Sequence, residues 1–126
     1  MRGFAVAVSF FILMLSGAAV IQSTLEKTSK NVVAEIDRLA DEVEKKQWEN
    51  ADKSMTNLEK KLHNTAKWIA MFVEHAEIDN IIMSFAAVKE YEKYRDIPEM
   101  MAETATLREL IEHIPRREAL SLENIL

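Results

Sequence analysis

The sequence has no cysteine, and it has only two glycines and two prolines among 126 residues. Without cysteine, the chain forms no disulfide and no Cys-ligated zinc site. Because an all-β sandwich needs turn residues about every 8–12 positions, so few glycines and prolines exclude that class of fold. Hydrophobic residues make up 48% of the chain and charged residues 29%, which suits a single helical domain.

Basic charge is also in short supply. Residues 1–22 contain Arg2 and no acidic side chain, so the rest of the chain has 15 basic and 21 acidic side chains. An acidic domain repels phosphates, and we expect no nucleic-acid partner. Both glycines lie before residue 18, so no glycine-rich phosphate loop is present, and no serine lies in a recognisable nucleophile motif. We therefore expect a protein that is not an enzyme and holds no cofactor.

An uncharged run, Phe4–Ile21, is the most apolar part of the chain. As a helix it would be about 27 Å long at 1.5 Å per residue, close to the roughly 30 Å hydrocarbon core of a bilayer. We expect residues 1–23 to form a retained membrane anchor and residues 24–126 to form a separate domain. The alternative is a cleaved signal peptide, with the small residues 16–18 (SGA) as its cleavage site.

The charges that flank this run are nearly balanced, with Arg2 on one side and Lys27 and Lys30 on the other. The likeness to an export signal favours an N-terminus inside the cell. We therefore expect a single-pass protein of the cell membrane whose C-terminal domain is extracytoplasmic. If the signal is cleaved, the same domain would instead be secreted.

Beyond Thr24 the apolar residues recur mostly at steps of three and four, in four successive segments. This heptad-like spacing is typical of helices that pack at small crossing angles, and no strand-like alternation competes with it. We predict an all-α fold, in which an N-terminal transmembrane helix is followed by an antiparallel bundle of three to four helices. The pattern would equally suit self-association. The stripe residues are Leu25, Val32, Ile36, Leu39 and Val43; Trp48, Ala51, Met55, Leu58, Leu62, Thr65, Ile69 and Phe72; Ile78, Ile81, Ile82, Phe85 and Val88; and Ile97, Met100, Thr104, Leu107, Ile111 and Ile114.

Two prolines mark expected helix ends. Pro98 suits the first turn of the fourth helix, with Asp96 as its N-cap. Pro115 is expected to end that helix, because the residue before a proline is disfavoured in helical geometry. The second and third segments are expected to separate at Glu74–Glu77, or else to form one long bent helix.

Tight turns between the helices would make successive helices alternate in direction. The turn at residues 74–79 and the end of the fourth helix would then meet at the end of the bundle nearest the membrane. We expect this meeting point to lie beside Glu26, Lys27 and Lys30.

Three stretches resemble a known family: QWENA at 47–51, KWIAMFVEHAEIDNI at 67–81 and LIEHIPRREALSLENIL at 110–126. Together with the apolar N-terminal segment, they resemble an uncharacterised family of spore-forming and related Gram-positive bacteria, known as domain of unknown function 4363. The resemblance implies a small membrane-anchored helical protein. It supplies no catalytic or binding residues.

The acidic turn is the strongest chemical candidate in the sequence. Glu74, His75, Glu77 and Asp79 offer carboxylates and an imidazole, and His113 would approach from the fourth helix. Such groups suit a divalent cation or a small ligand, although they are fewer than a dedicated zinc or calcium site needs. The simpler interpretation is that the acids and His75 complement the dipoles of the neighbouring helices.

Three further features are candidates for contacts with partners. Trp68 lies at the edge of an apolar stripe, where it would contact a partner protein. Arg116 and Arg117 are expected to be solvated or to touch anionic headgroups. The chain also ends in four large apolar residues, which we expect to fold back over the acidic turn, or else to form an exposed patch for a partner or the bilayer. These residues are Leu120, Leu122, Ile125 and Leu126.

These features predict a non-enzymatic interaction or structural module, anchored at the outer face of the cell membrane. It would act through a protein partner or through self-association. The alternative is an extracytoplasmic sensor or binding domain for a small ligand or a divalent cation.

Overall fold

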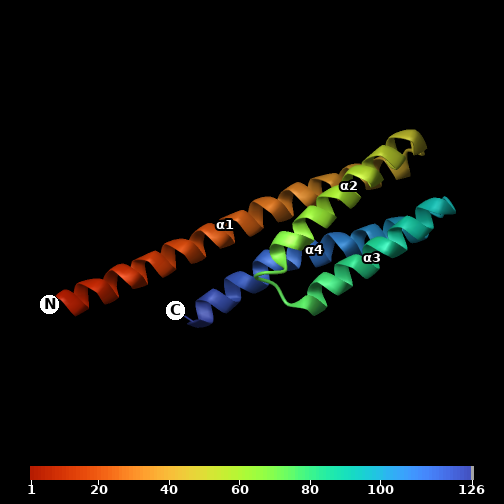
Figure 1. The fold of residues 1–126 in the computed structure, drawn as a ribbon. Coiled ribbons are helices and arrows are strands. Elements are labelled where there is room, and N and C mark those ends of the chain that lie inside the picture. Colours follow the sequence, from red (N-terminus) through yellow and green to blue (C-terminus); the bar gives the residue numbers. More distant parts are fainter. Residues whose placement is uncertain (126) are drawn as a thin grey trace.

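The computed structural model describes residues 1–125, and it is built from four helices. They are α1 (Arg2–Glu44), α2 (Trp48–Ile69), α3 (His75–Lys93) and α4 (Ile97–Ile125). Each helix reverses the direction of the one before it (Figure 1). No strand occurs in the described part of the chain. The predicted all-α class, with an apolar N-terminal helix and an antiparallel bundle, is confirmed.

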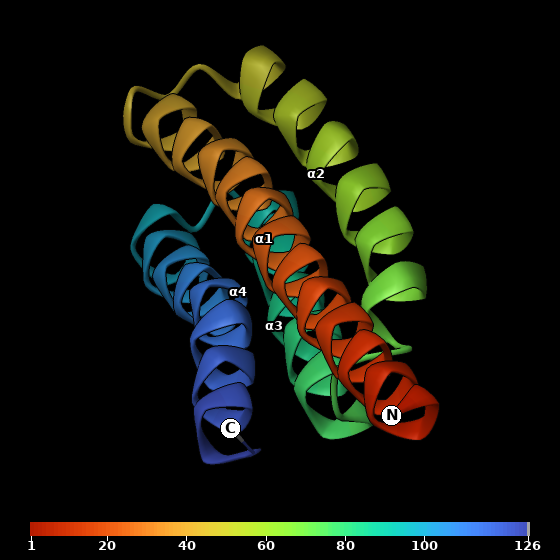
Figure 2. The ribbon, with the colours of Figure 1, turned by 90° about the vertical axis from the view of Figure 1, so that its left-hand side faces the viewer.

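Three pairs of helices pack closely: α1 with α2, α1 with α4, and α3 with α4. Figure 2, seen from the N-terminal end of α1, shows α1 between α2 and α4, with α3 behind it. The consecutive helices α2 and α3 do not form a close pair, and Figure 2 shows α2 standing apart from α3.

The first helix is continuous but has two different parts. Its N-terminal part has a mean hydropathy of 2.5 over 18 residues and is 0% buried, so it is long and apolar enough to cross a membrane. From Leu25 onward the same helix buries one face, and Ile36, Leu39 and Val43 are 0% exposed. The expected boundary between residues 23 and 24 falls inside α1, so no loop separates the apolar part from the bundle.

The end of the bundle from which the apolar part of α1 projects is called the base. The loop between α2 and α3 and the C-terminal end of α4 also lie at the base (Figure 1). The opposite end, which contains the α1–α2 and α3–α4 turns, is called the top.

The predicted stripes form one continuous core, with two exceptions. Phe72 is 36% exposed, because α2 ends at Ile69 and the stripe leaves the helix before reaching it. Ile82 is 54% exposed on α3, although its neighbour Ile81 is buried. The buried hydrophobic residues are Leu25, Val32, Val33, Ile36, Leu39, Val43, Ala51, Met55, Leu58, Leu62, Ile69, Val73, Ile78, Ile81, Phe85, Val88, Met100, Leu107, Ile111 and Ile114.

Two helices end without the glycine that usually follows a helix. Lys46 after α1 and Arg95 after α3 have φ angles of 56° and 53°, in the left-handed region. Beyond Lys46, the N–H of Gln47 donates to the carbonyl of Glu42 at 2.8 Å, which closes the end of the helix. The lack of glycine explains why the sequence carries no clear stop signal at these positions.

The separation between α2 and α3 lies at residues 70–74, about one turn before the expected position. One long bent helix, the alternative considered from the sequence, is not what forms. The N–H groups of Phe72 and Val73 both donate to the carbonyl of Ile69 at 2.9 Å, and Val73 is 5% exposed. Burial of Val73 therefore turns the chain where no glycine or proline does.

The expectation that Pro115 ends the last helix is wrong, because α4 continues to Ile125. A proline inside a helix cannot donate to the carbonyl four residues earlier, which here belongs to Ile111. The buried hydroxyl of Ser29 donates to that oxygen at 3.1 Å instead. The side-chain amide of Gln22 donates to the carbonyl of Pro115 at 2.8 Å. Side chains of α1 thus supply hydrogen bonds on both sides of the proline.

As far as Ile125, the C-terminal part of α4 does not fold back over the acidic turn, so for the described residues that prediction is also wrong. The last turns of α4 extend past the α2–α3 loop, toward the apolar end of α1 (Figure 1). Leu120 is 61% exposed there, and Leu122 is partly buried. The side chain of Ile125 and the whole of Leu126 lie outside the described residues.

Candidate functional site

A cluster of charged side chains joins α3 to α4 at the base. The guanidinium of Arg117 donates to the carboxylates of both Glu74 and Glu77, with Nη2 lying 2.8 Å from Oε1 of Glu74. His113 Nδ1 lies 3.6 Å from Oε1 of Glu77, which makes an ion pair when the imidazole is protonated. These four residues are called the basal cluster. The predicted meeting of the acidic turn with the end of the fourth helix therefore occurs.

Local sequence explains how the basal cluster is positioned. Glu74 is the N-cap residue of α3, and Glu77 lies in the first turn of that helix, where negative charge is favourable. His113 and Arg117 are four residues apart on α4, so they lie on the same face of that helix. The side chain of Glu77 is 14% exposed, whereas that of Glu74 is 67% exposed.

The negative charges of the basal cluster act on one further carboxyl group. Partial burial, reinforced by the charges of Glu77 and Glu74, raises the pKa of Glu118 above its ordinary value, while Arg117 opposes the shift. The raised pKa reflects chiefly the cost of ionising a partly buried carboxyl, to which the two neighbouring carboxylates add.

The other residues singled out from the sequence lie outside the basal cluster. His75 and Asp79 are exposed on α3, and none of the ion pairs found in residues 1–125 involves them. Trp68 is partly buried against the core, with its ring centroid 5.4 Å from that of Phe72. Trp68 thus lies at the edge of the apolar face, as expected.

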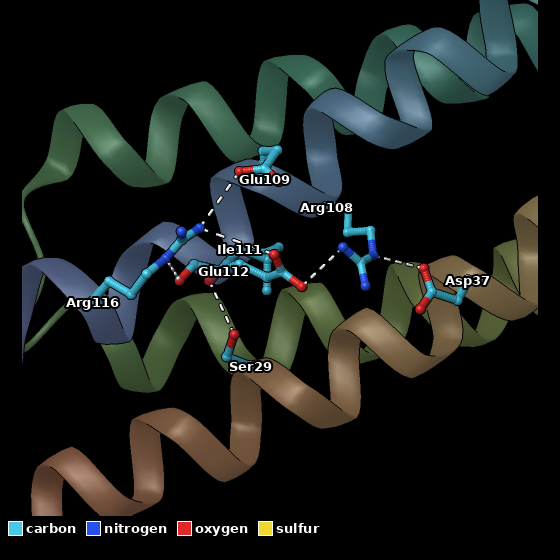
Figure 3. A network of polar contacts seen from close by, with 7 residues as sticks. All are labelled: Ser29, Asp37, Arg108, Glu109, Ile111, Glu112 and Arg116. Carbon is cyan, nitrogen blue, oxygen red and sulfur yellow. Dashed lines mark hydrogen bonds and ion pairs between the residues drawn. The ribbon is translucent and has the colours of Figure 1, made fainter.

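A second polar network links α4 to α1 around the proline (Figure 3). Arg108 reaches Asp37 of α1 at 2.8 Å and Glu112 of its own helix at 3.0 Å. Arg116 lies 3.5 Å from Glu109, so it is paired within α4. Arg116 and Arg117 remain solvent-accessible, with side chains 61% and 42% exposed, but each is also paired with acidic side chains, which the sequence did not indicate.

The residues of α1 expected beside the acidic turn lie on another side of α4. Glu26 and Lys30 share a shallow hollow with Glu112, Pro115 and Arg116, and neither Lys27 nor the acidic turn lines it. Because α4 packs against both α1 and α3, the two polar regions lie on different faces of the same helix.

At the top of the bundle is a charged group that the sequence pattern did not reveal. Arg95 binds both carboxylate oxygens of Asp52, at 2.8 and 3.3 Å, and its guanidinium lies 4.4 Å from the ring centroid of Trp48. Burial, reinforced by the charge of Asp52, raises the pKa of Glu92 to about 7. Asp96 and Pro98 marked the turn between α3 and α4 in the sequence, but no sequence pattern placed this turn beside α2.

The charged groups of the basal cluster are paired with one another. Within residues 1–125, no set of three or more His, Asp or Glu side chains lies close enough together to hold a metal ion. In the basal cluster, Arg117 occupies the position between two carboxylates that a cation would otherwise fill. What the base offers is a fixed arrangement of charges bordered by apolar side chains.

Comparison with known families identifies one match. The family model described as a domain of unknown function (DUF4363) matches residues 19–125, which is most of the chain. No curated protein and no solved structure matches the sequence. The chain therefore belongs to the DUF4363 family.

Proposed function

We propose that this protein is a single-pass, membrane-anchored module that binds a partner protein with the base of its bundle, at the outer face of the cell membrane and without catalysis. The observation that carries the proposal is the continuity of α1. Because one helix contains both the apolar part and a buried face of the bundle, the base is held next to the bilayer at a set height and angle.

Apolar side chains at the base support a role in partner binding. Met71 is 68% exposed and Phe72 is 36% exposed in the α2–α3 loop, and Trp68 packs beside Phe72. Leu120 is 61% exposed on the part of α4 that extends past the loop. Exposed apolar side chains beside fixed charges are typical of protein interfaces, in which aromatic residues and Met are enriched.

The pairing of the basal cluster supports a role without catalysis. Arg117 is paired with both neighbouring acids, so neither Glu74 nor Glu77 is poised as a base for a nucleophile. A divalent cation, the other candidate ligand, would have to displace this guanidinium.

The Gram-positive host implied by the sequence resemblance remains a prediction.

Topology can be tested with single thiols, because the chain has no cysteine of its own. Lys53→Cys places a thiol on an exposed position of α2, and Gly3→Cys places one where a Cβ meets no other atom within 4 Å. We expect a membrane-impermeant maleimide to label Lys53→Cys in intact cells and to label Gly3→Cys only after permeabilisation. The reverse pattern would contradict the outer-face orientation. Release of a shortened chain into the medium would show that the N-terminal segment is cleaved.

Partner binding can be tested by placing a photoreactive amino acid at Met71 of the full chain in its native membrane. We expect a discrete cross-linked protein, with no such product from the matched position Lys53 near the top. Cross-linking of equal strength at both positions would argue against a specific base surface. If the only cross-linked product is a second copy of this chain, the base surface serves self-association instead of binding a partner protein.

A further inference from the structure

The helices α2 and α3 face each other without packing closely, so the bundle is open along one side. Each of them packs instead on another helix, α2 on α1 and α3 on α4. An apolar groove of about 240 Å³ lies between them, with Leu62 and Ile69 of α2 and Ile81 and Phe85 of α3 among its lining residues. What joins α2 to α3 across this gap therefore decides how far apart the two helices stand.

Two ion pairs bridge the gap between α2 and α3. Lys89 Nζ lies 2.6 Å from Oε1 of Glu59. Arg95, in the turn that follows α3, binds both carboxylate oxygens of Asp52, at 2.8 and 3.3 Å. Asp52 precedes Glu59 by seven residues on α2, which places it roughly 10 Å nearer the top at 1.5 Å per residue. The pair made by Arg95 is thus the upper of the two links.

Four residues at this upper link are called the top clasp: Trp48, Asp52, Glu92 and Arg95. The guanidinium of Arg95 lies 4.4 Å from the ring centroid of Trp48, so a carboxylate and an aromatic face hold it together. The φ angle of Arg95 is 53°, and a non-glycine residue in this region is strained unless its surroundings hold it there. Because these contacts all come from α2, the conformation of the turn after α3 depends on the position of α2.

Glu92 is the member of the top clasp whose charge changes near neutral pH. Burial, followed by the charge of Asp52, raises the pKa of Glu92 to about 7. Hydrogen bonds from Arg95 and from the protonated carboxyl of Glu92 lower the pKa of Asp52, so the proton resides on Glu92. The Oε1 atom of Glu92 is buried and has no hydrogen-bond partner. When Glu92 loses its proton, two carboxylates lie beside one guanidinium in a partly buried site.

The charged groups that act on Glu92 come from α2 and from the α3 side of the gap. Asp52 opposes ionisation of Glu92, whereas Arg95 and Lys89 favour it. No charged side chain from the described part of α4, the helix on which α3 packs, is among these groups. The acids at the start of that helix are Glu99 and Glu103, with Asp96 just before it.

We propose that the top clasp is a proton-controlled switch, which joins α2 to α3 while Glu92 is protonated and releases the first turns of α2 when Glu92 ionises. The sign follows from linkage. A group whose pKa is raised in the closed form binds its proton more tightly there, so a rise in pH favours the open form. The pair between Lys89 and Glu59 is not part of the clasp, which confines the opening to the top. The proposal does not rest on partner binding at the base.

The test measures the separation of α2 and α3 by double electron–electron resonance, with the full chain in lipid nanodiscs. Because the chain has no cysteine, Lys53→Cys and Lys93→Cys place two spin labels at exposed positions beside the clasp without replacing any of its members. From about pH 5.5 to about pH 8.5 we expect a shift to longer distances, half complete at about pH 7. Helix content, followed by circular dichroism, should stay constant over the same range.

Two variants of the labelled chain assign the shift to Glu92. Glu92→Gln keeps a hydrogen-bond donor but cannot ionise, so the distance should stay short at every pH. The matched control, Glu90→Gln, removes an exposed acid two residues earlier on α3, and it should leave the shift and its midpoint unchanged.

Every other outcome overturns the proposal. A distance that is the same at both ends of the pH range would show that the clasp does not open. A shift that persists in Glu92→Gln, or that disappears in Glu90→Gln, would assign the pH dependence to another group. A shift accompanied by loss of helix content would show unfolding instead of opening. None of these results bears on the base, which cross-linking at Met71 tests separately.

Discussion

Replacing Ser29 by alanine should destabilise the bundle, because it removes the donor to the carbonyl oxygen of Ile111. Ser29 is 8% exposed, and its hydroxyl lies 3.1 Å from that oxygen. In most helices the carbonyl would keep its N–H partner four residues later, but here that residue is Pro115, which has no N–H. Ser29→Ala should therefore leave a buried acceptor without a protein donor.

The expected loss is about 1–3 kcal/mol, the range for an unsatisfied buried polar group. At roughly 4–8 °C per kcal/mol for a domain of this size, the Tm should fall by about 5–20 °C. The assay is thermal unfolding of residues 22–126, followed by circular dichroism, since this fragment contains every buried core residue. Ser23→Ala, at an exposed position of α1, should change stability by less than about 0.5 kcal/mol.

A double-mutant cycle with Pro115→Ala tests the reasoning itself. An alanine at position 115 restores the N–H, so the Ile111 carbonyl keeps a partner when Ser29 is removed. In that background Ser29→Ala should cost only about 0.5 kcal/mol, which gives a coupling energy of about 1–2 kcal/mol. Equal losses in the two backgrounds would refute the idea that Ser29 compensates for the proline.

Four further substitutions have expected outcomes in the same unfolding assay. Because the pKa of Glu92 is raised from 4.5 to about 7, its contribution to stability is full below pH 4.5 and is lost as the pH rises to about 7. Glu92→Gln should remove this pH dependence of stability and raise the free energy of unfolding by roughly 1 kcal/mol at about pH 8, allowing for partial exposure. The exposed control Glu90→Gln should retain the pH dependence. Lys46→Gly should raise the free energy of unfolding by about 1 kcal/mol, because glycine adopts a left-handed φ without strain. Arg95→Gly should raise it by less, because this substitution also removes an ion pair. Equal increases would contradict this account. Arg117→Ala should lower the Tm, and by less at high salt, because salt screens exposed ion pairs; a loss that does not depend on salt would argue against the ion pairs.

Much of the basal cluster could be predicted from sequence, because it follows from helix direction and periodicity. Glu74 and Glu77 are three residues apart and share a face, and both reach Arg117 on α4. His75 and Asp79 are four apart and share a different face, so the same geometry that unites the first pair leaves the second pair outside. The sequence pattern could not make this distinction, because it does not say which face of α3 turns toward α4.

Arg117 was missed as a member of the site for a related reason. Its position depends on α4 continuing beyond Pro115, and a proline alone predicts the opposite. The apolar groove between α2 and α3 was also out of reach of the sequence. The stripes on α2 and α3 are those of any core helix, and only their separation in space leaves a groove between them.

The sequence by itself determined the helical class, the apolar N-terminal segment and nearly all of the core, because these depend on local composition and on the spacing of apolar residues along one helix. Only the tertiary structure decided how far α4 extends, which charges meet at the base, and which pair of helices stays apart. The physical reason is that each of these depends on a contact between residues far apart in the chain. Ser29 lies 82 residues from the carbonyl that it satisfies, and Arg117 lies 43 from Glu74.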